Sequence, residues 1–152
     1  MLIKLSKKRS LREYWLFIEA WLLLATSRIL ILWIPFRKLL PLLGRPVSQE
    51  EAEMATSDYN MVSYELLEII RISILRACRR SPWRTKCFEQ ALSARMMLKR
   101  RGKISVIYFG LNKNLPDQHE KMTAHAWLKC SGIIVTGGKN NEIFTVVSRF
   151  LV

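Results

Sequence analysis

The fold of this chain is decided by the stretch at 86–111, which reads KCFEQALSARMMLKRRGKISVIYFGL. Its first part, from about Lys86 to Arg101, is predicted to be a helix. Basic residues fill the last turn of this helix, and Gly102 can take the left-handed cap position that ends it. From Ile104 to Leu111 the residues are β-branched and aromatic, which is typical of a strand. The stretch therefore predicts a helix followed directly by the first strand of a sheet.

Three further strands are predicted after this stretch. The segments 123–130, 133–136 and 142–150 have strand composition, and Ser131-Gly132 is a two-residue turn between the first two of them. The polar loop 112–122 separates them from the strand at 104–111. Because the helices come first and the strands later, the order favours an α+β fold with an antiparallel sheet over a βαβ repeat.

Another helix is predicted before the stretch, and it ends at Ser81-Pro82. Residues 50–68 contain six acidic residues and no Lys or Arg, whereas residues 71–103 contain eleven basic residues and a single acidic one, Glu89. We expect acids early and arginines late in one helix, since this order matches the helix dipole. The core face expected for this helix consists of Val62, Leu66, Ile69, Ile70, Ser73 and Ala77. The Pro/Gly-marked segment 41–46 is interpreted as the connection to an earlier helix, so we expect two parts, 1–48 and 49–152.

The first of these parts is unusually apolar. Its run from Tyr14 to Phe36 is too long for the core of a signal peptide, and no small-residue cleavage site follows it. Glu19 and Arg28 each cost roughly 2.5 to 3.5 kcal/mol near a bilayer centre, which disfavours a membrane span. The run is apolar nearly all round with basic flanks, so we expect a helix that packs on partner helices or lies on an anionic membrane surface. We expect a cytoplasmic protein, with membrane association through residues 14–36 as the alternative.

The composition narrows the class of protein. The 152 residues carry 25 Lys+Arg against 12 Asp+Glu, a formal charge of +13, and half of them are hydrophobic. A disordered basic tail would be poor in large apolar side chains, so the chain is expected to fold. The basic block at 71–103 would suit phosphate contacts, but no nucleic-acid-binding module is visible, and the acidic block at 50–68 would repel phosphates. We therefore expect no nucleic-acid partner.

The cysteines and histidines give a short list of reactive groups. Cys78, Cys87 and Cys130 form no CxxC pair, which predicts reduced thiols in the cytoplasm and no metal site. No motif indicates a cofactor. Cys78 and Cys130 are expected to be small apolar core residues, and His119 is expected to be solvated in the polar loop 112–122.

The two remaining residues, Cys87 and His125, are the candidates for a thiol nucleophile and its base. Cys87 lies at the start of the 86–101 helix, where unpaired backbone N–H groups and the positive dipole end favour a thiolate. His125 lies between two alanines at the centre of a predicted strand, on the same face as Trp127, and such a His can face a helix packed on the sheet. A helix-start Cys opposed by a strand-borne His is what a thiol nucleophile with an imidazole base requires. The alternative is a packed Cys and a core His beneath a Trp.

A wider set of motifs surrounds this pair. It consists of WRTKCF at 83–88, KRRG at 99–102, ISVIYFG at 104–110, AHAWL at 124–128, IVTGG at 134–138 and FTVVSRF at 144–150. This set resembles the transglutaminase-like leader peptidases of lasso-peptide biosynthesis over roughly residues 60–152, and the hydrophobic N-terminal helix also resembles theirs. The resemblance implies a transglutaminase/papain-like core, in which a Cys-bearing helix packs on an antiparallel sheet, over residues 49–152.

The resemblance also implies a function and partners. The function is that of a cysteine peptidase that cleaves the leader from a ribosomally made precursor peptide, with Cys87 and His125 as catalytic residues and Trp83 and Trp127 near the substrate. The partners are the precursor, a separate leader-recognition protein and an ATP-dependent macrolactam cyclase. The alternatives are an amine acyltransferase that uses the same dyad, and a basic binding or scaffold module for nucleic acid or a membrane surface.

The chain departs from the family pattern at the third catalytic residue. The family's triad usually ends with an Asp shortly after the His, but this chain has no Asp beyond Asp117. Pairing the strands across Ser131-Gly132 sets position 138 roughly opposite His125. The group that orients the imidazole is therefore a backbone carbonyl or one of three side chains, those of Thr136, Asn140 and Glu142.

Overall fold

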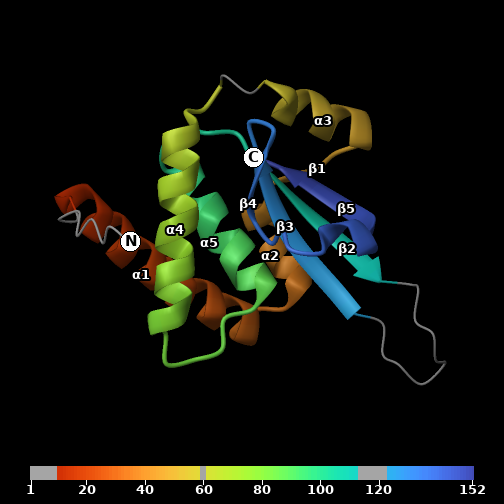
Figure 1. Ribbon diagram of the computed structural model, residues 1–152. Helices are drawn as coiled ribbons and strands as arrows, with labels where there is room; N and C mark the ends of the chain where they lie inside the picture. Colours follow the sequence, from red (N-terminus) through yellow and green to blue (C-terminus); the bar gives the residue numbers. More distant parts are fainter. Residues whose placement is uncertain (1–9, 59–60, 113–122) are drawn as a thin grey trace.

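The computed structural model describes residues 10–58, 61–112 and 123–152 (Figure 1). Its helices are α1 (Leu11–Trp33), α2 (Phe36–Leu43), α3 (Gln49–Ser57), α4 (Tyr64–Arg80), α5 (Cys87–Lys99) and the short 3₁₀ helix η1 (Asn141–Ile143). Its strands are β1 (Arg45–Pro46), β2 (Val106–Asn112), β3 (Thr123–Cys130), β4 (Ile133–Thr136) and β5 (Thr145–Leu151).

The strands form one antiparallel sheet in the order β1-β5-β2-β3-β4. The turn between β3 and β4 is the predicted Ser131-Gly132 pair, whose φ angles of 48° and 75° are those of a tight hairpin turn. Most of the helical part precedes the sheet along the chain. The predicted α+β class with a Cys-bearing helix, an antiparallel sheet and an N-terminal apolar helix is therefore confirmed.

The sheet separates two clusters of buried side chains because alternate residues of a strand point to opposite faces. From β3, Ala126 and Leu128 join the larger cluster with α1, α4 and α5. Trp127 joins the smaller cluster on the other face, where Ala52 of α3 packs with Tyr108 of β2. In Figure 1, α4 and α5 accordingly stand together on one side of the sheet, and α3 lies apart from them.

Helix α1 packs on α4 and α5 and contributes Leu16, Ala20, Leu24 and Ser27 to the buried interior. The hydroxyl oxygens of Ser27 and Ser93 of α5 lie 3.1 Å apart in that interface. The two helices can pack closely here because a small residue, serine, lies at the contact on each of them.

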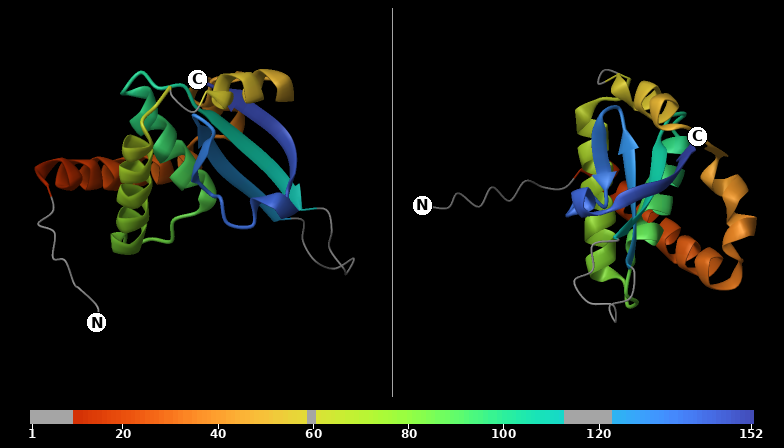
Figure 2. Two further views of the ribbon diagram at one scale, coloured as in Figure 1. Left: turned by 45° about the horizontal axis from the view of Figure 1, so that its top comes forward. Right: turned by 90° about the vertical axis from the view of Figure 1, so that its right-hand side faces the viewer.

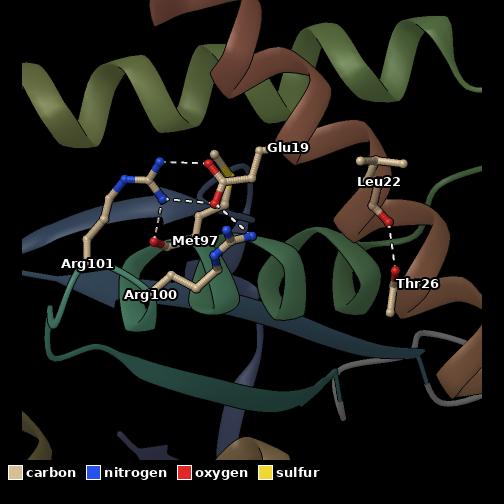
Figure 3. A network of polar contacts seen from close by, with 6 residues as sticks. All are labelled: Glu19, Leu22, Thr26, Met97, Arg100 and Arg101. Atoms are coloured by element: carbon tan, nitrogen blue, oxygen red, sulfur yellow. Dashed lines mark hydrogen bonds and ion pairs between the residues drawn. The ribbon is translucent and has the colours of Figure 1, made fainter.

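The two charged residues inside the apolar run form ion pairs at opposite ends of α5. Glu19 accepts hydrogen bonds from Arg101, 2.6 Å from Nη2 and 3.0 Å from Nη1, and Arg100 lies 3.5 Å from the same carboxylate (Figure 3). Arg28 donates from Nη1 to Oε1 of Glu89 at 2.8 Å. Since Glu19 contacts the end of α5 and Arg28 its start, α1 and α5 run antiparallel.

Among the described residues, α1 is the one helix long and apolar enough to cross a membrane by length and composition. Its ion pairs with α5 argue against a span, because Glu19 and Arg28 would have to leave their partners and enter hydrocarbon. The helix therefore packs on the rest of the chain through one face. The division of the chain at residue 48 remains a prediction.

Three details of the predicted elements are wrong. The segment 41–46 is not simply a connection, because α2 continues through Pro41 to Leu43 and β1 follows at once. Only part of the acidic block shares a helix with the arginines: Glu50, Glu51 and Glu53 lie on α3, a separate helix, and Val62 precedes α4. Helix α4 itself has the predicted order, with Glu65 in its first turn and Arg79 and Arg80 in its last. The last strand begins at Thr145 rather than 142, since residues 141–143 form η1.

Candidate active site

Cys87 is the first residue of α5, the position predicted for it. Lys86 is the N-cap residue with an extended backbone, and the carboxylate of Glu89 accepts a hydrogen bond from its N–H at 3.3 Å. The first backbone N–H groups of a helix have no partner within the helix. A half-buried thiol therefore lies at the positive end of α5, beside backbone donors.

His125 lies on β3 and is held by a backbone carbonyl. Its Nε2 atom is 2.7 Å from the carbonyl oxygen of Gly137. A carbonyl oxygen can only accept, so Nε2 carries the proton and Nδ1 of the neutral ring keeps its lone pair. The hydrogen bond thus selects the tautomer in which Nδ1 can act as a base.

Two aromatic rings fix the plane of the imidazole. The ring centroid of His125 is 5.8 Å from that of Trp127 and 4.8 Å from that of Phe144. Gly110 lies opposite His125 in the β2/β3 register, and a Cβ there would come within 2.7 Å of Phe144 and 2.9 Å of Trp127. The absence of a side chain at position 110 lets both rings close on His125.

Cys87 and His125 line one cavity of about 550 Å³. By strand alternation His125 shares its face with Trp127, opposite the face that α5 covers. It reaches the cavity because β4 pairs only with Leu128–Cys130 and leaves this end of β3 at the edge of the sheet. Both residues line this cavity, and no hydrogen bond between Sγ of Cys87 and the imidazole is present among the described residues.

Of the four groups expected to orient the imidazole, the backbone carbonyl occupies that position. Gly137 has φ +72°, and a bulge in the β3/β4 pairing after Leu128 shifts the register from the simple hairpin count. The Thr136 side chain is 7 % exposed and lines the cavity, and its hydroxyl has no hydrogen-bond partner. Asn140 and Glu142 are exposed and lie outside the cavity lining.

The two tryptophans expected near the substrate lie outside the cavity lining. Trp83 packs on Trp21 of α1 with ring centroids 5.6 Å apart. Trp127 is 5 % exposed, and its ring stacks on that of Tyr108 with centroids 5.6 Å apart. It therefore packs against His125 and does not line the cavity. His119 and the rest of the loop at 113–122 lie outside the described residues.

Three polar residues that line the cavity were not singled out from the sequence. Gln90 lies one turn after Cys87 on α5, and helical side chains lean toward the N-terminus, so both residues line the same part of the helix surface in the cavity. The i, i+3 spacing from Cys87 was the available signal. Arg71 of α4 and Lys139, which follows β4, bring positive charge to the opposite wall.

The other two thiols differ from Cys87. Burial raises the pKa of Cys78 despite a hydrogen bond with Thr85, and burial raises the pKa of Cys130 to about 11. The thiol of Cys130 donates to the carbonyl of Ile104 at 3.1 Å. Within residues 10–58, 61–112 and 123–152, no group of three or more His, Cys, Asp or Glu gathers as metal ligands would.

Comparison with known proteins gives one finding. The family model described as Transglutaminase-like superfamily matches residues 30–149, from near the end of α1 into β5. No curated protein and no solved structure gives a significant match.

Proposed function

The chain belongs to the transglutaminase-like superfamily, and from this membership we propose that it is a cysteine peptidase that cleaves the leader from a lasso-peptide precursor. Members of this superfamily are typically Cys-dependent peptidases or acyltransferases. The observation that carries the proposal is the shared cavity of Cys87 and His125, with the imidazole fixed by Gly137.

The reaction begins with a proton transfer. The thiol proton of Cys87 moves from Sγ to Nδ1 of His125, because Nε2 is engaged by the carbonyl of Gly137. The thiolate sulfur then attacks the carbonyl carbon at the leader/core junction. Hydrogen bonds between catalytic groups commonly tighten only in the substrate complex, so a thiol and base that share an open cavity are compatible with this step.

The tetrahedral adduct collapses by breaking the C–N bond. The imidazolium of His125 gives its Nδ1 proton to the departing core amine, and a thioester then joins the leader to Cys87. Water, deprotonated by the neutral imidazole, attacks the thioester. This second attack releases the leader carboxylate and restores the thiol.

The negative oxygen of the adduct needs donors, each of which contributes about 3 to 4 kcal/mol. The backbone N–H of Cys87 at the start of α5 is the first. The side-chain amide of Gln90 supports a second, because it lines the same cavity and has no hydrogen bond among the described contacts. Both donors come from one rigid helix.

The carbonyl of Gly137 would replace the family's Asp as the hydrogen-bond acceptor for His125. It fixes the tautomer and the plane of His125, as an amide acceptor does in other Cys-His enzymes. A carbonyl is neutral, so it stabilises the imidazolium less than a carboxylate would. We therefore expect a working enzyme with a modest turnover rate.

The cavity walls suit a peptide that carries carboxylates. Arg71 and Lys139 line it, and no acidic side chain from the described part of the chain does. A separate leader-recognition protein and an ATP-dependent macrolactam cyclase complete the proposed assembly, in the cytoplasm. The first would deliver the leader to the cavity, and the second would use the core amine that cleavage exposes.

The experiment is mass spectrometry of a candidate precursor after incubation with the protein, with and without the leader-recognition protein. The proposal expects a free leader carboxylate and a core peptide, with faster cleavage when the partner is present. Transfer of the leader acyl group to an added amine, without hydrolysis, would indicate that the protein is an acyltransferase that uses the same dyad. An intact precursor under all conditions would contradict the proposal.

A further inference from the structure

Helix α1 has a second apolar face that is left exposed among the described residues. Its members are exposed by 44 to 82 %: Leu11, Tyr14, Trp15, Ile18, Leu22, Ile29, Leu32 and Trp33. At 100° per residue these positions form one stripe along the helix, opposite Leu16, Ala20 and Leu24, which face the core. We call these eight residues the outer stripe.

The outer stripe is long and accessible. A helix of 23 residues measures about 34 Å, and the stripe runs over its whole length. In the left view of Figure 2 the first turns of α1 project beyond α4, and the side chains of Leu11 and Trp15 there are 80 % and 70 % exposed. An exposed apolar surface of this extent on a soluble domain marks a binding surface.

Positive charge borders the outer stripe at both ends. Arg12 is exposed at its start, and Arg37 and Lys38 are exposed just after its end. The sequence before Ser10 is also basic. No exposed acidic side chain lies among the stripe residues, since Glu13 and Glu19 of α1 are half-buried and paired with Arg76 and with Arg100 and Arg101.

A basic cavity adjoins the start of the stripe. It has a volume of about 330 Å³ and is lined by Glu13, Tyr14 and Phe17 of α1 and by Arg76, Arg79 and Arg80 at the end of α4. Glu13 pairs with Arg76, so the excess positive charge of the cavity comes from Arg79 and Arg80. Arginine side chains bind phosphate oxygens through paired N–H donors. The cavity therefore offers a place for an anionic headgroup beside an apolar surface.

We propose that the outer stripe binds an anionic phospholipid membrane, with α1 lying in the plane of the surface. The apolar side chains enter the headgroup/acyl boundary, the tryptophans near both ends occupy the interface, and the flanking cations contact lipid phosphates. The helix does not cross the bilayer, because its inner face stays on α4 and α5 through the pairs of Glu19 and Arg28.

The charge pattern favours a membrane over a second copy of the chain. A second copy would bring Arg12, Arg37 and Lys38 against their own like charges or against an apolar surface, and it offers no acidic stripe to match them. An anionic bilayer supplies negative charge along the full length of the helix together with an apolar layer. This inference is independent of the proposed peptidase activity.

The test is co-sedimentation of the full chain with two kinds of vesicle, phosphatidylcholine alone and an equal mixture with phosphatidylglycerol. We expect binding to the mixed vesicles to be at least about tenfold tighter, and this preference should weaken at high salt. The double variant Ile18→Glu/Leu22→Glu should lose most binding. Its matched control is Met54→Glu/Met61→Glu, which makes the same charge change at exposed apolar residues outside the stripe and should bind like the wild type.

Three outcomes would overturn the proposal. One is the absence of binding to mixed vesicles at low salt, and another is equal loss of binding in both double variants. The third is a dimer in sedimentation analysis that Ile18→Glu/Leu22→Glu dissociates, without vesicle binding, since the stripe would then join two copies. Circular dichroism of each variant separates loss of binding from loss of fold.

Discussion

The guanidinium of Arg28 on α1 lies 2.8 Å from the carboxylate of Glu89, two residues after Cys87 on α5. The Glu89 side chain is 1 % exposed and the Arg28 side chain 29 %. The second oxygen of Glu89 accepts from the N–H of Lys86, just before Cys87. The N-terminal helix thus helps to hold the first turn of α5, which carries Cys87, the proposed nucleophile.

Replacing Arg28 by Met should lower both stability and activity. The change leaves the buried carboxylate of Glu89 without its cation, and the partial exposure of Arg28 limits the expected cost to about 2 kcal/mol in the free energy of unfolding. Urea denaturation measures this cost, and Arg28→Lys should recover part of it. The matched control is Arg45→Met, which breaks the exposed pair of Arg45 with Glu51 and should leave stability close to that of the wild type. Equal stability of both Met variants would contradict the role given to Arg28.

Replacing Gly137 by Ala should slow catalysis more than it weakens substrate binding. The residue has φ +72°, and a Cβ would lie 2.5 Å from the carbonyl oxygen of Ala126, so the backbone must move and carry its own carbonyl away from His125. We expect kcat to fall roughly 10- to 100-fold, the range of general acid–base contributions. Gly102→Ala is the control, because it has φ +64° but open space around its Cβ. Equal kcat values for Gly137→Ala and Gly102→Ala would contradict the proposal that the Gly137 carbonyl orients His125.

Alkylation by iodoacetamide should select Cys87. At neutral pH the raised pKa values of Cys78 and Cys130 keep both thiols protonated, and Cys130 is also buried. Peptide mapping by mass spectrometry should find Cys87 modified at least about tenfold faster than either of them. The difference from Cys78 should shrink as the pH rises toward the pKa of that thiol. Equal rates for Cys78 and Cys87 at neutral pH would argue against a reactive nucleophile at position 87.

Gln90→Ala should reduce kcat about 10²-fold with a small change in KM, because an oxyanion donor acts mainly in the transition state. Gln90→Glu has nearly the same shape without the N–H donors and should be at least as slow. Steady-state kinetics of precursor cleavage separates kcat from KM. A Gln90→Ala variant with wild-type kcat would leave the second oxyanion donor to another group.

The elements around the site could be predicted from the sequence because their signals are local. The helix from Lys86 to Gly102 has its cap and its terminal charges within the segment itself. The signal for α3 was also local, since Ser48 and Glu51 form the start of a helix in which the Ser48 hydroxyl accepts from the Glu51 N–H at 3.2 Å. It was missed because the acidic residues were assigned to the helix that follows.

The remaining features depend on contacts between distant segments. The hydrogen bond from His125 to Gly137 lies beyond the bulge in the β3/β4 pairing after Leu128, and a register shift of one residue has no separate signal in the sequence. The partners of Glu19 and Arg28 lie more than sixty positions away along the chain. The sequence therefore indicates the candidate nucleophile and base, and the structure shows the groups that hold them.

The most direct test of the account is the cleavage of a candidate precursor by three proteins, the wild type, Cys87→Ala and His125→Ala, followed by mass spectrometry. Binding of the precursor to each variant is measured alongside, so that loss of chemistry is separated from loss of fold. We predict that both variants bind the precursor and that neither variant cleaves it. Cleavage by Cys87→Ala at the wild-type rate would contradict the central claim that this thiol is the nucleophile.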